Sequence, residues 1–250
     1  MMGSEESQGV IPRGLREIGG MASFVLVHGA WHGSWCWQRV RSALQAQGHQ
    51  VFTPTLTGVG ERSHLLSAQV DLHTQTLDVI NLIRWEGLTD IVLCGHSYGG
   101  FVVSGVADEL PERVRSLVFL DAFVPEDGES LAHYAPITAA QLNDGWKVKP
   151  ISAEAFGVNP ADREWADSQC TSQSVACFEQ PIQLTGRLAQ IKRIDYIFAN
   201  AWGGGHSPFI QFYEKAKARG WRTHEVACGH DVMIDEPAAL TELLVRAIHP

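Results

Sequence analysis

The chain has 250 residues, enough for one large domain or a domain with an insertion, and its 45% hydrophobic and 19% charged residues are typical of a globular protein. Its net charge of -9 argues against nucleic acid and anionic membranes as partners. No run approaches the roughly 20 apolar residues that span a bilayer. Residues 1–22 carry acidic residues early and no apolar core, so we expect a disordered leader rather than a secretory signal.

The rest of the chain alternates short apolar runs with helical patterns. The runs have the length and the β-branched content of buried strands, and the patterns place apolar residues at helical spacing. In chain order we expect strand 24–28, helix 35–47, strand 51–54, helix 72–85, strand 91–95, helix 101–110, a strand within 114–125, strand 196–199, helix 208–219, a strand within 224–229 and helix 237–248. This alternation predicts a mostly parallel sheet with helices on both faces.

Residues 126–192 interrupt the alternation. The segment mixes prolines with scattered aromatic residues, and it is too long for a bare loop within a compact domain. We therefore expect a partly helical cap, inserted into a core that is formed by residues 23–125 and 193–250.

The most informative motif is GHSYG at residues 95–99. It is a G-x-S-x-G sequence between a predicted strand and a predicted helix, which is the context of a nucleophile elbow. In such a turn Ser97 is strained and its hydroxyl is exposed, while the flanking glycines allow close approach of neighbouring backbone. Ser97 is therefore the candidate nucleophile. The alternative is a glycine-rich loop with an incidental serine.

A serine nucleophile needs a base, and His230 follows the last predicted strand. The carboxyl ends of the strands in an open α/β sheet line one crevice, so we expect His230 and Ser97 to meet at the same edge. The alternative for His230 is an exposed loop histidine. If it is the base, the rate should fall on acidification with an apparent pKa within about one unit of 6.5.

The segment after the first predicted strand, HGAWHGSWCW at residues 28–37, is rich in small residues. We expect the backbone N–H groups of Ala30 and Tyr98 to form an oxyanion hole beside Ser97, each contributing on the order of 3 kcal/mol. His28 and His32 have no evident third partner for a metal ion. We expect structural hydrogen bonds from both, and we assign neither a metal nor a cofactor.

Three segments together resemble the α/β-hydrolase superfamily, namely residues 24–37, 94–100 and 229–237. Within it they are most similar to the group of plant methyl esterases, hydroxynitrile lyases and bacterial pyrethroid-type carboxylesterases. The resemblance implies an α/β-hydrolase fold with Ser97 as nucleophile, His230 as general base and acid, and Ala30 with Tyr98 as oxyanion hole.

Two departures from that group narrow the chemistry. Its hydroxynitrile lyases carry a threonine and a lysine at the positions of Gly29 and Asp231. A cation that would hold the departing cyanide is therefore missing. Hydrolysis of a carboxylic ester through an acyl-enzyme fits this chain better than cyanohydrin cleavage.

The sequence offers two candidates for the third catalytic residue. The family's acid normally follows the strand predicted at 196–199, where this chain has Asn200. An amide can accept a hydrogen bond from His230 Nδ1–H, but it cannot stabilise the imidazolium as an anion does. Asp121, at the end of the preceding predicted strand, is the candidate replacement, because some α/β-hydrolases draw their acid from there. Its alternative role is to cap the loop to Pro125. As the acid, its carboxylate should lie about 2.6–3.2 Å from His230 Nδ1.

Tryptophans near these motifs predict the substrate. Trp31, Trp35 and Trp202, with the aromatic residues of segment 126–192, indicate a pocket for a small apolar or aromatic ester, although a single tryptophan also serves core packing. His206 is interpreted as a pocket residue or a loop residue. One rival function is a lyase or other non-hydrolytic enzyme acting on an aromatic or polyketide-like metabolite. The other is a ligand-sensing protein that hardly turns over.

The five cysteines are an odd number, which indicates reduced thiols and a cytoplasmic protein. Cys170 and Cys177 are the one pair that could form a disulfide. A small-molecule ester is the expected partner, and a homodimer is left open.

Overall fold

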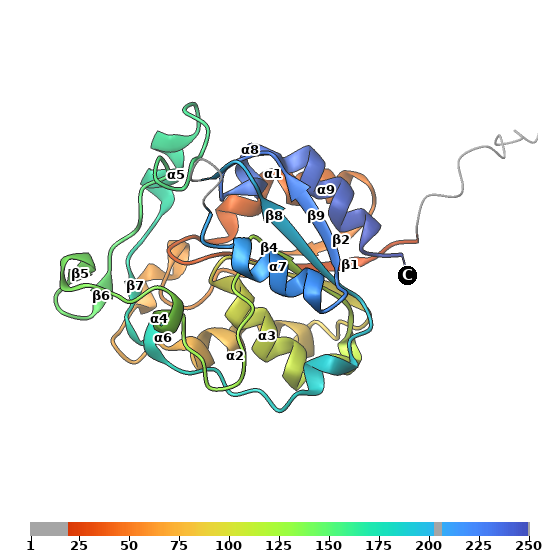
Figure 1. The fold of residues 1–250 in the computed structure, drawn as a ribbon, viewed down its shortest axis with the longest axis horizontal. Coiled ribbons are helices and arrows are strands. Elements are labelled where there is room, and N and C mark those ends of the chain that lie inside the picture. Colours follow the sequence, from red (N-terminus) through yellow and green to blue (C-terminus); the bar gives the residue numbers. More distant parts are fainter. Residues whose placement is uncertain (1–19, 203–206, 250) are drawn as a thin grey trace, which may run out of the picture.

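The computed structural model describes residues 20–202 and 207–249, and it contains a six-stranded parallel sheet with helices on both faces (Figure 1). The strand order is β2-β1-β3-β4-β8-β9, and every neighbouring pair is parallel. The strands are β1 (Ser23–Val27), β2 (Gln50–Phe52), β3 (Ile91–His96), β4 (Val114–Leu120), β8 (Ile194–Ala199) and β9 (Arg222–Val226). The α/β-hydrolase architecture expected from the sequence is confirmed. Of the leader expected at residues 1–22, residues 1–19 lie outside the described residues.

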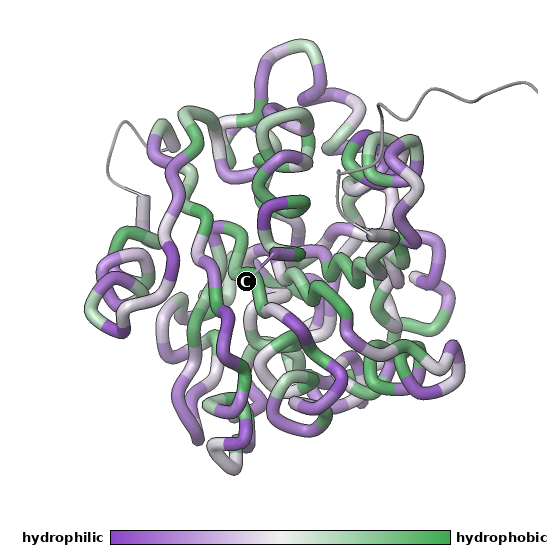
Figure 2. Tube along the Cα trace, turned by 90° about the vertical axis from the view of Figure 1, so that its right-hand side faces the viewer, coloured by the Kyte–Doolittle hydropathy of each residue, from purple (hydrophilic) through white to green (hydrophobic). Residues whose placement is uncertain are grey.

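The central strands are apolar runs because the sheet is covered on both faces. Every residue of β3 and β8 is buried, and so is all of β4 except Arg115. Figure 2 shows hydrophobic stretches gathered toward the middle of the molecule and hydrophilic ones mostly toward its outside. Continuous burial of this kind is the reason that period-two alternation is missing from these strands.

The helices form two layers around the sheet. On one side α1 (Gln38–Ala46) packs against α9 (Pro237–Arg246), and on the other α2 (Leu72–Trp85) packs against α3 (Gly99–Glu109) (Figure 1). The helix expected from residue 35 begins as a 3₁₀ turn, η1 (Ser34–Trp37), and becomes α-helical at Gln38. Four short elements complete the core: η2 (Gly60–Leu65), η3 (Pro111–Arg113), α7 (Ile210–Ala218) and α8 (Val232–Asp235).

Residues 126–192, the cap, join β4 to β8, which are adjacent in the sheet. Most of the cap lies beyond the carboxyl ends of the strands, whereas its last residues, including η5 (Arg187–Gln190), run back toward the amino ends (Figure 1). In addition to short helices it contains a small antiparallel sheet of order β5-β6-β7, which the sequence did not predict. Its elements are α4 (Leu131–Tyr134), η4 (Ala139–Gln141), β5 (Leu142–Asn143), β6 (Lys147–Val148), α5 (Arg163–Gln169), β7 (Gln173–Ser174), α6 (Ala176–Glu179) and η5 (Arg187–Gln190).

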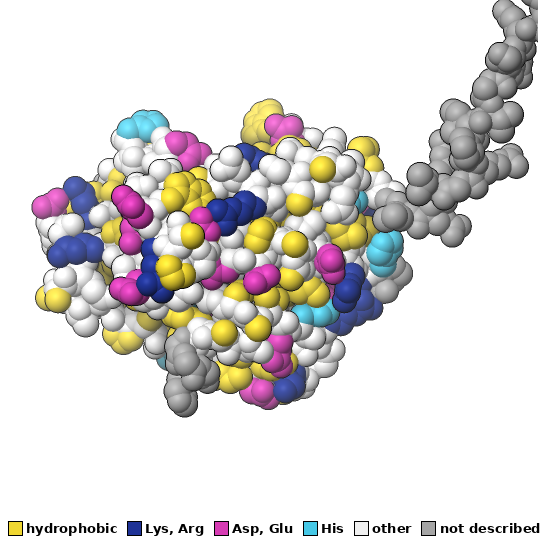
Figure 3. Space-filling view, turned by 90° about the horizontal axis from the view of Figure 1, so that it is seen from above, with side chains coloured by type: hydrophobic (Ala, Val, Ile, Leu, Met, Phe, Trp, Pro, Cys, Tyr) yellow, Lys and Arg dark blue, Asp and Glu magenta, His cyan; other side chains and the backbone are white. Residues whose placement is uncertain are grey.

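Two whole-chain features complete the description. All five cysteines lie in the described part of the chain and are free, so the disulfide considered between Cys170 and Cys177 is not formed. In residues 20–202 and 207–249, no helix has the length and apolar character needed to cross a membrane. Acidic and basic side chains are interspersed on the face drawn in Figure 3.

Candidate active site

Ser97 occupies a sharp turn between β3 and α3. Its φ of 53° is in the left-handed region, which is strained for a residue with a side chain. The turn depends on close backbone contacts, since a Cβ added at Gly95 would lie 2.5 Å from the Gly99 carbonyl oxygen and one at Gly100 would lie 2.1 Å from that of Phe123. This geometry is that of a nucleophile elbow.

Backbone strain is concentrated around this turn. Among the described residues, five that are not glycine have positive φ, and three of them are Trp31 at 65°, Ser97 at 53° and Asp121 at 39°. Each of the three follows a strand of the sheet, at its carboxyl end. Strained conformations of this kind cost about 1–3 kcal/mol each and gather at functional sites, where the surrounding structure enforces them.

His230 and Asp121 lie together at the same edge. Asp121 Oδ2 is 2.6 Å from His230 Nδ1, and Asp121 Oδ1 accepts a hydrogen bond of 3.2 Å from the Ala199 amide. Both side chains are almost fully buried, at 0% and 1% exposure. Burial raises the pKa of the Asp121 carboxyl, and the hydrogen bond from Ala199 opposes that shift.

Asn200 lies at the end of β8, but its side chain is engaged elsewhere. Its Nδ2 donates a hydrogen bond of 2.8 Å to Glu225 Oε2. Glu225 also accepts a hydrogen bond from Tyr213. Asp121, and not Asn200, therefore provides the polar group beside His230 Nδ1.

The imidazole of His230 packs against aromatic rings. Its centroid is 4.8 Å from Phe209 at an interplanar angle of 13°, and 4.6 Å from Trp202 at 25°. Burial lowers the pKa of His230 from 6.5 to about 4, and the Asp231 charge opposes this. The apparent pKa expected from the sequence, within about one unit of 6.5, is corrected downward because the ring is shielded from water.

Ala30 and Tyr98 flank Ser97 as expected from the motifs, and Ala30 lines the same cavity as Ser97. Within residues 20–202 and 207–249, no group accepts a hydrogen bond from the Ala30 or the Tyr98 amide. His28 Nδ1–H donates to the Gly29 carbonyl, 2.8 Å away, in the same peptide group as the Ala30 N–H. That bond polarises the peptide group and strengthens its N–H as a donor.

His28 and His32 make the structural hydrogen bonds expected of them. His28 Nε2 accepts a bond of 3.0 Å from the Leu56 amide, and burial lowers the pKa of His28 to about 3. His32 lies 2.7 Å from the Ala30 carbonyl oxygen through Nδ1 and 3.3 Å from Asp231 Oδ2 through Nε2. Although burial opposes it, the Asp231 charge raises the pKa of His32. No cluster of potential metal ligands is found among the described residues.

Ser97 and His230 line one cavity of about 210 Å³. Its other polar side chains among the described residues are Gln141, Gln211 and Tyr134, whose hydroxyl donates to Glu129. No Lys, Arg, Asp or Glu of the described chain lines it. The walls are aromatic: Trp31, Phe123, Tyr134, Phe156, Phe178, Trp202 and Phe209. This volume is below the range of about 300–1,000 Å³ usual for drug-sized ligands, so the cavity suits a small, uncharged, apolar molecule.

Not every aromatic residue considered from the sequence reaches the cavity. Trp31 and Trp202 line it, whereas Trp35 stacks on His32 at 5.1 Å and lies outside its walls. His206 is outside the described residues. Phe123 and Phe209 were missed, and the only signal for Phe123 was its place two residues after Asp121.

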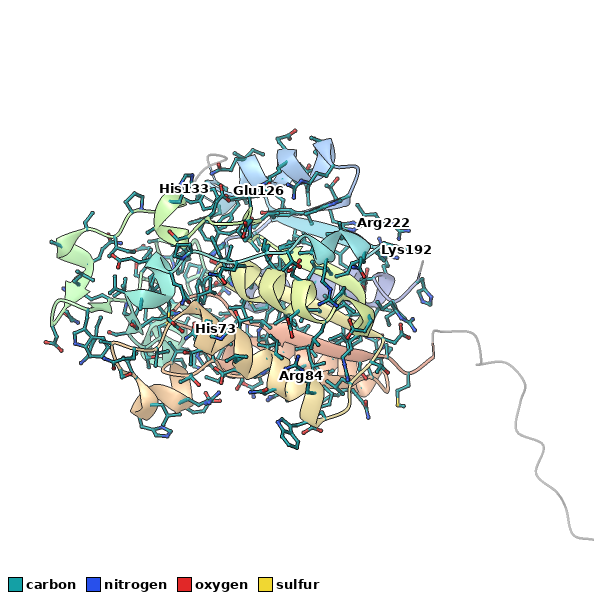
Figure 4. The ribbon with its side chains drawn as sticks, turned by 90° about the horizontal axis from the view of Figure 1, so that it is seen from below. His73, Arg84, Glu126, His133, Lys192 and Arg222 are labelled. Atoms are coloured by element: carbon teal, nitrogen blue, oxygen red, sulfur yellow. The ribbon has the colours of Figure 1, made fainter. Side chains whose placement is uncertain are left out.

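A larger hollow of about 600 Å³ lies at the opposite edge of the sheet, among the amino ends of β8 and β9. Lys192 and Arg222 line it, close together and on the other side of the molecule from His133 of the cap (Figure 4). Its described lining residues include no serine and no cysteine. The smaller, aromatic cavity is therefore the candidate active site.

Comparison with known proteins shows the family of the chain. Residues 24–243 match the family described as the alpha/beta hydrolase family. A carbendazim hydrolyzing esterase of Nocardioides sp. (strain SG-4G) is 44% identical over 90% of this chain and 98% of its own length. Methylesterase 4 of Arabidopsis thaliana is 27% identical over 85% of this chain and 80% of its own length.

Solved structures share the fold. An extracellular alpha/beta-hydrolase from a Paenibacillus species superposes with a TM-score of 0.77, at 25% identity, over 90% of this chain and 98% of its own. The pyrethroid hydrolase PytH superposes with a TM-score of 0.73 at 20% identity, over 92% of this chain and 98% of its own. The chain belongs to the alpha/beta hydrolase family, and it is an ester hydrolase.

Proposed function

We propose that Ser97 attacks the carbonyl carbon of a small, uncharged ester and forms an acyl-enzyme that water then hydrolyses. The proposal rests on one observation. Ser97 and His230 line the same apolar cavity, and Asp121 Oδ2 lies 2.6 Å from His230 Nδ1. The arrangement has the polar groups that a serine hydrolase needs, in the order nucleophile, base and acid.

Each side chain has a defined task in this mechanism. Neutral His230 takes the Ser97 hydroxyl proton and later gives it to the departing alcohol. Asp121 holds the imidazole with its proton on Nδ1 and stabilises the imidazolium. The amides of Ala30 and Tyr98 donate to the oxyanion of the tetrahedral intermediate. The same groups then activate water to release the acid product.

The cavity supports an aromatic or apolar ester as the substrate. Its aromatic walls favour a flat, apolar group, and a volume of about 210 Å³ limits the size of that group. The 44% identical relative is named for carbendazim hydrolysis, and the Arabidopsis relative for methyl ester hydrolysis. Carbendazim and methyl esters of small aromatic acids are therefore the first substrates to test.

Ser97→Ala tests the proposal. The variant should fold normally, because the hydroxyl contributes little packing, and it should lose hydrolysis of short p-nitrophenyl esters. A serine-directed phosphonate should label the wild-type protein once and the variant not at all. Turnover above a tenth of wild type in Ser97→Ala would remove Ser97 as nucleophile.

The rival functions are separated by the same assays. A ligand-sensing protein would bind the aromatic ester and hardly turn it over. Against a cyanohydrin lyase, the residue after His230 is the anion Asp231, held by His32 at 3.3 Å, where that lyase group carries a lysine. The cytoplasmic location and the homodimer stay predictions, as do the expected absences of nucleic-acid and membrane partners.

A further inference from the structure

We propose that the cap is a fixed part of the catalytic machinery, in which Gln173 of β7 and Gln75 of α2 are positioning residues for the oxyanion loop, residues 28–33. The proposal rests on the proposed function in one respect, which is that Ala30 and Tyr98 supply the oxyanion hole. It adds two residues that touch neither substrate nor the reacting atoms.

The first step is the attachment of Trp31 to the cap. Trp31 directly follows Ala30, and its φ of 65° is strained for a bulky residue. Its amide donates to Gln173 Oε1 at 3.0 Å, and its carbonyl accepts from the Thr171 amide at 3.0 Å. Its indole Nε1 donates to the Val148 carbonyl at 3.1 Å. All three partners belong to the cap, so the cap holds Trp31 in its strained conformation.

The second step is the connection from Gln173 to the nucleophile elbow. Gln173 Nε2 donates to Gln75 Oε1 at 3.0 Å, and the Tyr98 hydroxyl donates to the same oxygen at 2.7 Å. Gln75 Nε2 donates to the Thr57 carbonyl at 2.8 Å. A continuous chain of hydrogen bonds therefore runs from Trp31 through both glutamines to Tyr98, and joins the two residues that carry or adjoin the oxyanion donors.

The third step is burial. Gln75, Gln173 and Tyr98 are exposed by 0%, 1% and 0% respectively. Removal of one amide leaves its partners buried and unsatisfied, which is costly and is relieved only by movement of the backbone. The strained peptide at Trp31 is the part that can relax, and its relaxation turns the Ala30 N–H away from Ser97. Small misplacements of this kind reduce rates by up to about 10²-fold.

The experiment compares two neighbouring, buried cap residues. Gln173→Leu removes both hydrogen bonds of the amide and nearly keeps its size. Ser174→Ala is the matched control, because Ser174 is the next residue of β7 and is also buried, at 0% exposure. Its hydroxyl bonds only to the Ala68 carbonyl and the Ala176 amide. We measure kcat and KM with a short p-nitrophenyl ester, the melting temperature, and the affinity for a trifluoromethyl ketone, whose adduct with Ser97 places an oxyanion in the hole.

Gln173→Leu should lower kcat and the trifluoromethyl ketone affinity by roughly 10- to 100-fold, while KM and the affinity for a neutral ester analogue stay within about threefold. Ser174→Ala should leave kcat, KM and both affinities within about twofold. Gln173→Glu keeps an acceptor for the Trp31 amide, so its kcat should lie between those of wild type and Gln173→Leu. If Gln173→Leu does not fold, Gln173→Glu and Gln75→Leu carry the same comparison. The Gln75→Leu, Gln173→Leu double variant should be no more than about threefold worse than the poorer single variant, because one network is broken only once.

An unchanged ketone affinity in folded Gln173→Leu would overturn the inference, as would a loss confined to KM or to the melting temperature. Phosphonate labelling separates this result from a failure of the proposed function. If wild type is labelled at Ser97 and Gln173→Leu behaves like wild type, the positioning role is wrong. If the wild-type protein is not labelled at Ser97, the proposed function itself is wrong.

Discussion

Asp121 ties together two strand ends and the catalytic histidine. Its Oδ1 accepts from Ala199 at the end of β8, the strand end where the family usually carries the acid, while its Oδ2 faces His230 Nδ1 at 2.6 Å. The Asp121 carboxylate, carried by the residue that follows β4, thus lies beside the end of β8, where the acid of the family is usually attached. The buried backbone amide of Ala199 provides a donor that keeps one oxygen fixed.

Asp121→Asn should therefore lower kcat by roughly 10²–10⁴, because the amide keeps the shape but loses the charge and can select the wrong tautomer of His230. Asn200→Ala is the comparison, and its loss should stay within about tenfold, since Asn200 bonds to Glu225 and not to His230. Both are measured by steady-state kinetics at equal folded fraction. An Asn200→Ala loss larger than that of Asp121→Asn would transfer the role to Asn200.

The pH dependence of hydrolysis is set by His230, which must be neutral to accept a proton. Burial lowers its pKa to about 4, so the neutral form persists to lower pH than in an exposed histidine. The rate should therefore stay nearly constant between pH 7 and pH 5.5 and decline as the pH falls toward 4. Initial rates with a short p-nitrophenyl ester, checked against tryptophan fluorescence for folding, measure this. A midpoint at 6.5 or above would contradict the buried state of the imidazole.

Individual site residues differ in how far the sequence could predict them. Ser97 and His230 were identifiable because each sits in a local motif directly after a strand. The choice between Asp121 and Asn200 could not be made with certainty, because both follow strands at the same edge and only the tertiary structure decides which one faces His230. Gln75 and Gln173 left no signal, since their partnership spans 98 positions of the chain.

At the scale of elements, the packing of α3 depends on its glycines. The Gly100 Cα faces the Phe123 backbone, and an added Cβ would lie 2.1 Å from that carbonyl oxygen. Backbone cannot move aside as a flexible side chain does. The helix and the loop after β4 can therefore come this close only with glycine at position 100.

Gly100→Ala should lower the free energy of unfolding by roughly 1–3 kcal/mol and the melting temperature by about 3–10 °C. Gly105→Ala in the same helix is the control. There the nearest atom is a Thr76 methyl at 3.0 Å, and alanine's better helix propensity of about 1 kcal/mol offsets the contact, so the melting temperature should change by less than about 3 °C. Calorimetry of both variants measures the two melting temperatures. Equal values would show that the loop after β4 moves to make room for the added methyl group.

The elements also show where sequence patterns lose information. The strands and helices of the core were predictable to within a few residues because each is long enough to have a period or an apolar run. The strands of the cap have two residues each, for example β7 (Gln173–Ser174), and two residues carry no periodicity. Their pairing depends on contacts with β6 and with the core, which a local pattern does not contain.

At the scale of the whole molecule, a loss of stability in acid follows from histidines that are buried without charge. Burial lowers the pKa of His28 to about 3 and moves that of His96 well below its usual value. Below pH 6.5 protons therefore bind to these histidines in the unfolded chain but not in the folded chain. The free energy of unfolding decreases as the pH decreases. The charge on His32 lowers the pKa of Asp231 despite burial, so that carboxylate adds to the loss in stronger acid.

Each proton that only the unfolded chain binds costs about 1.4 kcal/mol per pH unit. Burial lowers the pKa of His28 to about 3 and that of His230 to about 4, so these two histidines should lower the free energy of unfolding by roughly 3 kcal/mol per unit between pH 6 and pH 4.5. His96 adds to this fall, and the Asp121 carboxyl, whose pKa burial raises, offsets part of it. Melting temperatures measured at intervals of half a pH unit test this. Between pH 8 and pH 7 the same histidines are mostly neutral in both states and contribute little slope. A melting temperature that is constant from pH 7 to pH 4 would contradict the burial of these two rings.

The attachment of Trp31 to β6 and to residues 171–173 also bears on how such an enzyme can change during evolution. A cap that only covered the substrate could be exchanged between relatives as a module. Here an exchange would replace the substrate walls and, with them, the support of the Ala30 amide, so a transplanted cap would bring new specificity and poor turnover together. We therefore expect new substrates to be reached through single substitutions on the cavity wall, at positions such as Phe178, with the backbone of the small cap sheet kept.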